Sequence, residues 1–163
     1  MSLIRARKNI CTFVYYKFTK SLSISKIIYA SPQYWALLRM REIELRLPLG
    51  MRYQKLDIKN EAEEWIYAYF LQDRIVASCQ FIIEGDKAKM RQVATVKTYQ
   101  GRGIGKDLFM HCEEELRKHG IKEIYCHARK NAIPFYEKLN FEIYSDEFDE
   151  VGIPHLKMKK TLV

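Results

Sequence analysis

Three glycines within five residues are the feature of this sequence with the clearest chemical implication. Gly101, Gly103 and Gly105 lie in the segment QGRGIGK (100–106), between a strand-like pattern and a helix-like pattern. Glycine loses much conformational entropy on folding, so this density indicates a need for exposed backbone. The first turn of a helix offers free N–H groups and a partial positive charge, which together bind phosphate. The loop therefore predicts a phosphate-binding turn.

Two common phosphate-binding motifs do not match this loop. A Walker A loop needs four residues between its glycines and a Ser or Thr after the lysine, whereas three residues separate Gly101 from Gly105 and Asp107 follows Lys106. A dinucleotide fingerprint needs a third glycine where Lys106 stands, and its strand opens a βαβ unit rather than following hairpins. Both kinds of nucleotide site are excluded.

The remaining pattern is Q-x-x-G-x-G, formed by Gln100, Gly103 and Gly105. It follows the strand-like segment RQVATV (91–96) and precedes NAIPFYEKLNF (131–141). In order and spacing, these segments resemble the acyl-CoA loop, its preceding strand and the A-x-x-F-Y-x-x-x-G-F motif of the GNAT family of N-acetyltransferases. Asn140 replaces the usual glycine of that motif, and asparagine also tolerates a left-handed backbone. The resemblance covers roughly residues 22–160.

The resemblance implies an α/β fold of the mixed α+β kind. A central, mostly antiparallel sheet would contain one splayed parallel strand pair and would be flanked by helices. The pantetheine arm of acetyl-CoA would lie in that gap like an added strand, bound by backbone groups of Val93, Ala94 and Thr95 and contacted by Asn131. The turn would hold the pyrophosphate through its backbone N–H groups, and Arg102 and Lys106 would add positive charge. The residues of the turn are Gln100, Gly101, Arg102, Gly103, Ile104, Gly105 and Lys106.

The reaction implied by the resemblance is direct attack of a primary amine on the thioester in a ternary complex. The thiolate of CoA leaves, and Tyr136 matches the family tyrosine that serves as its general acid and contacts the cofactor. A buried aromatic residue with a bonded hydroxyl is the alternative role for Tyr136. An amine with a pKa near ~10.4 must also lose a proton before it attacks, so a base is needed.

The general base is open, because the strand-like segment 88–96 lacks the glutamate that many family members carry there. The candidates are His127, at the end of a short strand, His155, in the segment GIPHLKM (152–158), and Glu84, at the end of the preceding strand. The structural alternative is a buried imidazole for His127, a polar residue at a strand edge for His155 and a solvent-exposed turn carboxylate for Glu84. Glu84, Glu150 and His155 are also candidate substrate contacts. Glu150 belongs to an acidic run, 146–150, that would attract a cationic amine or form a solvated loop.

Metal binding is not expected. His111, Cys112, His119, Cys126 and His127 are close in sequence, but adjacent helical side chains diverge by about 100° and no CxxC or HxxxH pair is present. The four cysteines, at positions 11, 79, 112 and 126, form no paired framework and indicate reduced thiols in a cytoplasmic protein. No apolar run approaches the ~20 residues of a membrane span, and the basic start is a poor signal peptide.

Strand-like and helix-like segments alternate along the chain, as the resemblance requires. Short turns at 72–74 and 84–86 join three strands into antiparallel hairpins. Ser31, Gly120 and Asn131 are expected at helix ends. The expected strands are 24–30, 65–71, 75–83, 88–96, 122–128, 141–145 and 154–160, and the expected helices are 32–47, 104–120 and 131–139.

The length of 163 residues indicates one domain, with residues 1–20 as an extension or as an extra strand at 10–16. The net charge of +8 resides in residues 1–52, which hold ten Lys or Arg and two acids. This leaves an alternative function: a non-catalytic GNAT-fold module whose basic third binds nucleic acid or a regulatory partner. A solvated basic face is the simpler interpretation. The favoured function is an N-acetyltransferase for a small-molecule or peptide amine, monomeric or homodimeric, without nucleic acid, membrane or metal.

Overall fold

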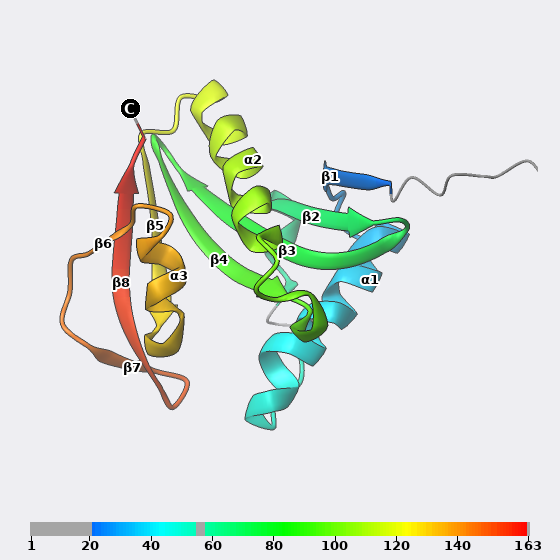
Figure 1. The fold of residues 1–163 in the computed structure, drawn as a ribbon, viewed down its shortest axis with the longest axis horizontal. Helices are drawn as coiled ribbons and strands as arrows, with labels where there is room; N and C mark the ends of the chain where they lie inside the picture. Colours follow the sequence, from blue (N-terminus) through cyan, green and yellow to red (C-terminus); the bar gives the residue numbers. More distant parts are fainter. Residues whose placement is uncertain (1–20, 55–57, 163) are drawn as a thin grey trace, which may run out of the picture.

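The computed structural model describes residues 21–54 and 58–162, which form one eight-stranded sheet with helices on both faces (Figure 1). The candidate strand at 10–16 lies outside the described residues. The strand order is β1-β2-β3-β4-β5-β8-β6, and β7 pairs with β8. All neighbouring strands are antiparallel except β4 and β5, which are parallel. The predicted fold class is confirmed.

The elements occur in the predicted order. The strands are β1 Leu22–Lys26, β2 Trp65–Leu71, β3 Arg74–Glu84, β4 Lys87–Thr95, β5 Glu123–Arg129, β6 Glu142–Ile143, β7 Phe148–Glu150 and β8 Ile153–Thr161. The helices are α1 Pro32–Arg41, α2 Ile104–Lys118 and α3 Ile133–Glu137. Single helical turns lie at η1 Glu42–Arg46, η2 Leu47–Leu49, η4 Glu61–Glu63, η5 Lys97–Tyr99 and η6 Lys130–Ala132. Within the described residues, no helix is long and apolar enough to cross a membrane.

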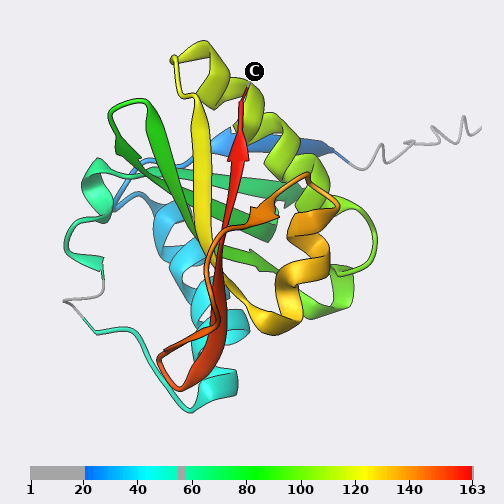
Figure 2. The same cartoon turned by 90° about the vertical axis from the view of Figure 1, so that its left-hand side faces the viewer.

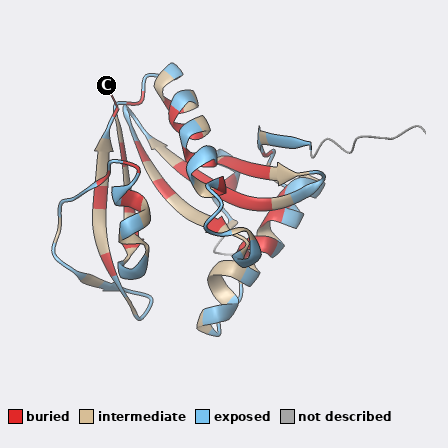
Figure 3. Cartoon of the chain, viewed as in Figure 1, coloured by how far each residue is buried: buried red, intermediate tan, exposed pale blue. Residues whose placement is uncertain are grey.

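The sheet separates two hydrophobic layers (Figures 1 and 2). On one face, α2 and α3 cover the larger layer, which includes the predicted apolar stripe of α2, namely Ile104, Leu108, Cys112 and Leu116. On the other face, α1 covers a smaller layer around Tyr34 and Leu37. Figure 3 shows that the buried residues concentrate along the central strands and the inner sides of the helices.

The expected splay of the parallel strand pair is present (Figure 1). Strands β4 and β5 are in register only from Lys87 and Glu123 to Met90 and Cys126, whereas β5 continues to Arg129 against β8. The two strands therefore separate where the family resemblance places the pantetheine arm.

A β-bulge accounts for the divergence. Ser78 pairs with Ala94 and Gln80 pairs with Arg91, so a two-residue step on β3 faces a three-residue step on β4. Gln92 in the bulge has a φ of +52°, the left-handed region. A bulge bends its strand and increases local twist, which turns β4 away from β5. The sequence analysis did not predict this bulge.

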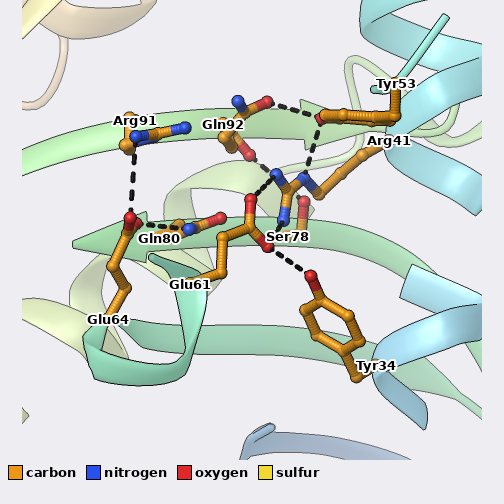
Figure 4. Close-up of polar contacts among 9 residues, drawn as sticks. All are labelled: Tyr34, Arg41, Tyr53, Glu61, Glu64, Ser78, Gln80, Arg91 and Gln92. Carbon is orange, nitrogen blue, oxygen red and sulfur yellow. Dashed lines mark hydrogen bonds and ion pairs between the residues drawn. The ribbon is translucent and has the colours of Figure 1, made fainter. Parts of the chain in front are cut away.

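A buried polar network beneath α1 holds the bulge (Figure 4). The guanidinium of Arg41 contacts Glu61 at 2.7 Å, and the two side chains are 0% and 1% exposed. Arg41 also donates through Nε to the Tyr53 hydroxyl at 3.2 Å, and that hydroxyl donates to Gln92 Oε1 at 2.9 Å. The bulge is thus linked through two side chains to the buried ion pair.

Several predicted element ends differ from the structure. The first strand ends at Lys26, because the chain turns at Ala30, with a φ of +59°, before α1. Ser31 caps α1 as predicted, accepting from Tyr34 N at 3.1 Å. Regular α-helix ends at Arg41 rather than near residue 47, and the chain continues through the π-helical turn η1 and the 3₁₀ turn η2.

The predicted cap at Asn131 is wrong. Asn131 lies within the 3₁₀ turn η6, and α3 begins at Ile133 without a side-chain cap. Pro134 has no N–H to donate to a cap at that position. Asn140 adopts the left-handed conformation expected of it, with a φ of +64°. Part of the acidic run, expected as a loop, forms β7 against β8.

Candidate active site

A cavity of about 600 Å³ lies where β4 and β5 diverge. Its walls come from β4, from Lys89 to Thr95, from β5, from the start of α3, from the β7–β8 hairpin and from the turns after α1. Segments distant in sequence therefore meet at one site. The predicted site residues that line it are Val93, Ala94, Thr95, Gln100, His127, Asn131, Tyr136, Glu150 and His155.

The glycine turn is open at the start of α2. Gly101 and Gly103 have φ values of +73° and +82°, and a Cβ atom at either position would meet nothing within 4 Å. The first hydrogen bond of α2 runs from Asp107 N to Gly103 O at 2.9 Å, so the earlier amides, from Ile104 to Lys106, have no acceptor within the helix. An unobstructed turn with free amides fits a pyrophosphate.

Gly105 has a different role from the other two glycines. A Cβ atom there would lie 3.3 Å from Phe135 Cε2 and 3.4 Å from Thr95 Oγ1. The absence of a side chain thus allows α2 to pack closely on α3 and on the end of β4. Gly105 is therefore needed for packing, in addition to the phosphate contact predicted for its amide.

The side chain of Gln100 fixes the turn to β4. Its Nε2 donates to the carbonyl oxygen of Thr95 at 2.9 Å, which bridges the loop between β4 and α2. Arg102 lies over the ring of Tyr99, with Cζ 5.4 Å from the ring centroid. Gln100 therefore supports the turn and also reaches the cavity wall.

Tyr136 is a buried residue of α3 that reaches the cavity. Its ring makes edge contacts with Phe135 and Phe141, at centroid distances of 5.2 and 5.6 Å. Burial raises the pKa of the Tyr136 hydroxyl well above its ordinary value, against a smaller opposing effect of Arg129. The hydroxyl is therefore protonated at neutral pH and can donate a proton or a hydrogen bond.

Both candidate histidines line the cavity. His127 Nδ1 lies 2.7 Å from Glu150 Oε2, and His155 Nδ1 lies 2.8 Å from the carbonyl oxygen of Ile153. Ionised carboxylates and carbonyls only accept, so each Nδ1 carries the proton in these contacts. In the neutral ring, each Nε2 then keeps its lone pair. The two imidazoles flank the Phe148 ring, at centroid distances of 5.2 and 6.0 Å.

Glu84 lies outside the cavity. It pairs in register with Lys87 at the closed end of the sheet, where β4 and β5 are still hydrogen-bonded. Its Oε2 accepts from the Tyr125 hydroxyl at 2.6 Å, and burial together with this bond raises the pKa of Tyr125 to about 12. The structure does not bring Glu84 together with the other candidate residues.

The acidic run is largely engaged by the chain itself. Glu147 pairs with Lys130 at 2.7 Å, and Asp149 Oδ1 accepts from Gly152 N at 3.0 Å. Of this run, Glu150 alone is among the cavity-lining residues, and it is bonded to His127.

Sequence reasoning missed one side of the cavity. This side comes from the segment that follows α1, which contains no recognisable motif. Its cavity-lining residues are Glu44, Leu45, Arg46, Leu49 and Met51. Lys89, Arg91 and Arg129 were missed as well. The signal for Lys89 and Arg91 was present, since they alternate with the buried Ala88 and Met90 and must face the opposite side of β4.

The described His, Cys, Asp and Glu side chains include no group of three that could hold a metal ion. His111 packs on the ring of Tyr67 and His119 on the ring of Trp65, at centroid distances of 6.0 and 4.7 Å. The thiols of Cys79, Cys112 and Cys126 are buried and free, and burial raises the pKa of Cys126 to about 12.

Comparison with known proteins agrees with this geometry. The family description "Acetyltransferase (GNAT) domain" matches residues 51–162. The chain belongs to the GNAT acetyltransferase family. It is an acyltransferase of that family, and this favours the enzyme over the non-catalytic module.

This GNAT acetyltransferase has relatives of known sequence and structure. The uncharacterized protein YyaT of Bacillus subtilis is 31% identical over 110 residues, which cover 68% of this chain and 74% of YyaT. A candidate N-acetyltransferase from Lactobacillus plantarum superposes with a TM-score of 0.79 at 24% identity, over 88% of this chain and 99% of that one. An aminoglycoside 6'-N-acetyltransferase solved with coenzyme A has a TM-score of 0.72 at 17% identity, over 86% of this chain and 97% of that one.

Proposed function

We propose that this acyltransferase transfers the acetyl group of acetyl-CoA to a primary amine, by direct attack in a ternary complex. The observation that carries the proposal is the cavity between the diverging β4 and β5, next to the open glycine turn. The coenzyme A in the aminoglycoside acetyltransferase, which shares the fold, supports acetyl-CoA as the donor.

The backbone beyond the end of the β4–β5 ladder is suited to an extended ligand. Ala94 and Thr95 pair with β3 on one side, while on the other side β5 has separated from β4. An unpaired strand edge binds extended chains through its N–H and C=O groups. Val93, Ala94 and Thr95 would thus hold the pantetheine arm, and the amides from Arg102 to Lys106 would hold the pyrophosphate. Bound acetyl-CoA supplies an activated thioester.

Two proton transfers are assigned to residues of the cavity. We assign the base to His127, because Glu150 orients its ring and stabilises the imidazolium that forms when Nε2 takes a proton from the amine. His155, held by a neutral carbonyl, is the second candidate. Tyr136 donates its proton to the departing sulfur, and its raised pKa keeps the hydroxyl protonated until then.

Two assays test the proposed function. Acetyl-CoA at millimolar concentration should raise the melting temperature, because a ligand that binds only the folded state stabilises it. Release of free CoA should then depend on an added amine, within a panel of small amines and amine-bearing peptides. Absence of both the thermal shift and CoA release would refute the proposal.

The compartment and the partners belong to the same proposal. Free buried thiols at Cys79, Cys112 and Cys126 are compatible with a reducing cytoplasm. The acceptor is a small molecule or a peptide, and the enzyme works as a monomer or homodimer.

The basic N-terminal third, residues 1–52, is the part of the chain that could bind nucleic acid. Half of its Lys and Arg residues lie in residues 1–20, outside the described residues. A salt-dependent DNA titration should show no tight binding; steep salt dependence would favour a nucleic-acid partner.

A further inference from the structure

We propose that the acceptor amine carries a carboxylate, as an amino acid does, and that a basic wall of the cavity binds this group. The basic wall consists of Lys89, Arg91 and Arg129. This inference rests on the proposed function and specifies its substrate class.

The basic wall results from strand alternation. Lys89 and Arg91 are two residues apart on β4, so they share one face, about 6.6 Å apart along the strand. Ala88 and Met90 are buried on the other face, against α2. On β5, Arg129 likewise alternates with the buried Ala128, and all three cationic side chains line the same cavity.

The cations of the wall have few partners among the residues that the structure describes. The ammonium group of Lys89 makes no hydrogen bond or ion pair with any residue in 21–54 or 58–162. Arg91 contacts Glu64 at 3.6 Å and is 31% exposed. Arg129 donates through Nη2 to the Leu45 carbonyl at 3.2 Å, which leaves further guanidinium N–H groups for a ligand.

The buried Arg41 shows how the same fold treats a guanidinium that has no external ligand (Figure 4). Its two Nη atoms both donate to Glu61, and its Nε donates to Tyr53. In the same view, the guanidinium of Arg91 makes a polar contact with Glu64 at 3.6 Å and with no other side chain of residues 21–54 or 58–162. The Arg91 guanidinium thus keeps N–H groups that Arg41 has already used, and the basic wall is a surface suited to an external anion.

The carboxylates of the cavity are already bonded. Glu44 Oε2 accepts from Lys97 N at 3.2 Å, and Glu150 Oε2 accepts from His127. A polycation would meet the three cationic side chains of the basic wall, whereas the two acids of the lining are already bonded. A carboxylate would instead gain charge-assisted hydrogen bonds from ammonium or guanidinium groups.

The test compares acceptors that carry a carboxylate with acceptors that do not. An amino acid, its carboxamide and its decarboxylated amine are assayed with acetyl-CoA, alongside spermidine, and kcat/KM is expressed per deprotonated amine. We expect the amino acid to be favoured at least about tenfold over its carboxamide. In Lys89→Gln that ratio should fall to within about twofold, whereas Lys89→Arg should keep it, because the charge remains.

The controls separate this inference from the proposed function. Lys122→Gln, at an exposed lysine paired with Asp86 outside the cavity, should keep the preference. Arg129→Gln, with its fold checked by melting temperature, replaces Lys89→Gln if the latter does not fold. Equal rates for acid and carboxamide, or fastest acetylation of spermidine, would overturn the inference and leave acetyl transfer standing. No transfer to any amine and no thermal shift with acetyl-CoA would overturn both.

Discussion

Met90 and Cys126 are the last residues at which β4 and β5 remain in register. Beyond this pair, the bulge at Gln92 bends β4 toward β3, and the cavity fills the space between the strands. The position of one bulge therefore determines where the sheet opens and which side chains surround the opening.

The Tyr53 hydroxyl should stabilise the bulge. Tyr53→Phe removes the bond to Gln92 at 2.9 Å and leaves Arg41 Nε without its acceptor at 3.2 Å. We expect a loss of about 1–2 kcal/mol in the free energy of unfolding, measured by urea denaturation, and a higher KM for acetyl-CoA. Tyr144→Phe, at an exposed tyrosine, is the control and should change neither quantity. Unchanged stability in Tyr53→Phe would contradict the role given to this bond.

Gly103→Ala should separate backbone strain from ligand binding. Gly103 and Gly85 both have positive φ values, +82° and +65°, and both face open space. Alanine at either position should cost about 1–2 kcal/mol of stability. Only Gly103→Ala should also weaken acetyl-CoA binding, by about tenfold or more in Kd measured by calorimetry, because Gly85 lies in a distant hairpin turn. Equal affinity in the two variants would exclude the turn as the pyrophosphate site.

Tyr136→Phe should lower kcat on the order of 10²-fold with little change in acetyl-CoA affinity. The ring fills the same space, so the aromatic contacts with Phe135 and Phe141 persist. Rapid-quench and binding measurements would separate the two effects. A variant with the wild-type rate would remove Tyr136 from the mechanism and leave it as a packing residue.

Three substitutions should identify the base. His127→Gln should reduce kcat/KM by about 10²-fold or more, and Glu150→Gln by a smaller factor, since Glu150 acts through the imidazole. His155→Gln should have the weaker effect of the two histidine variants, because a carbonyl rather than a carboxylate holds its ring. The reverse order of effects would assign the base to His155.

The stability of the fold should depend on the ionisation of Glu113. Burial alone would raise its pKa, but bonds from Lys160 at 2.6 Å and Arg117 at 2.7 Å outweigh burial and lower the pKa below the ordinary 4.5. A lowered folded-state pKa stabilises the fold above pH 4.5, and this contribution is lost as the pH falls through the folded-state value.

Glu113→Gln should therefore unfold more readily than wild type at pH 7, by roughly 1–3 kcal/mol. Its disadvantage should shrink below pH 4.5, as the wild-type carboxylate also becomes protonated. Glu114→Gln, at an exposed residue of the same helix, is the matched control. A constant difference between Glu113→Gln and wild type from pH 7 to acid would contradict this linkage.

The elements and the open glycine turn could be predicted because their signals are local. Apolar residues at every fourth position specify the buried side of α2. The left-handed backbone conformation at Gly101 and Gly103 follows from the residue type. The bulge at Gln92 gave no such signal, since glutamine in a strand carries no preference for a positive φ. Glu84 was misplaced as a site candidate, because its distance from the splay depends on the register of two strand pairs.

The sequence by itself determined the order of the elements, the open turn before α2 and the position of Tyr136, because these depend on residues within one turn or one strand. Only the tertiary structure decided which charges share the cavity. Arg129 meets the Leu45 carbonyl across 84 positions of sequence, and His127 meets Glu150 across 23. Such contacts result from strand register and bending of the sheet, which no local pattern contains. The set of charges that lines the cavity is therefore a property of the folded chain.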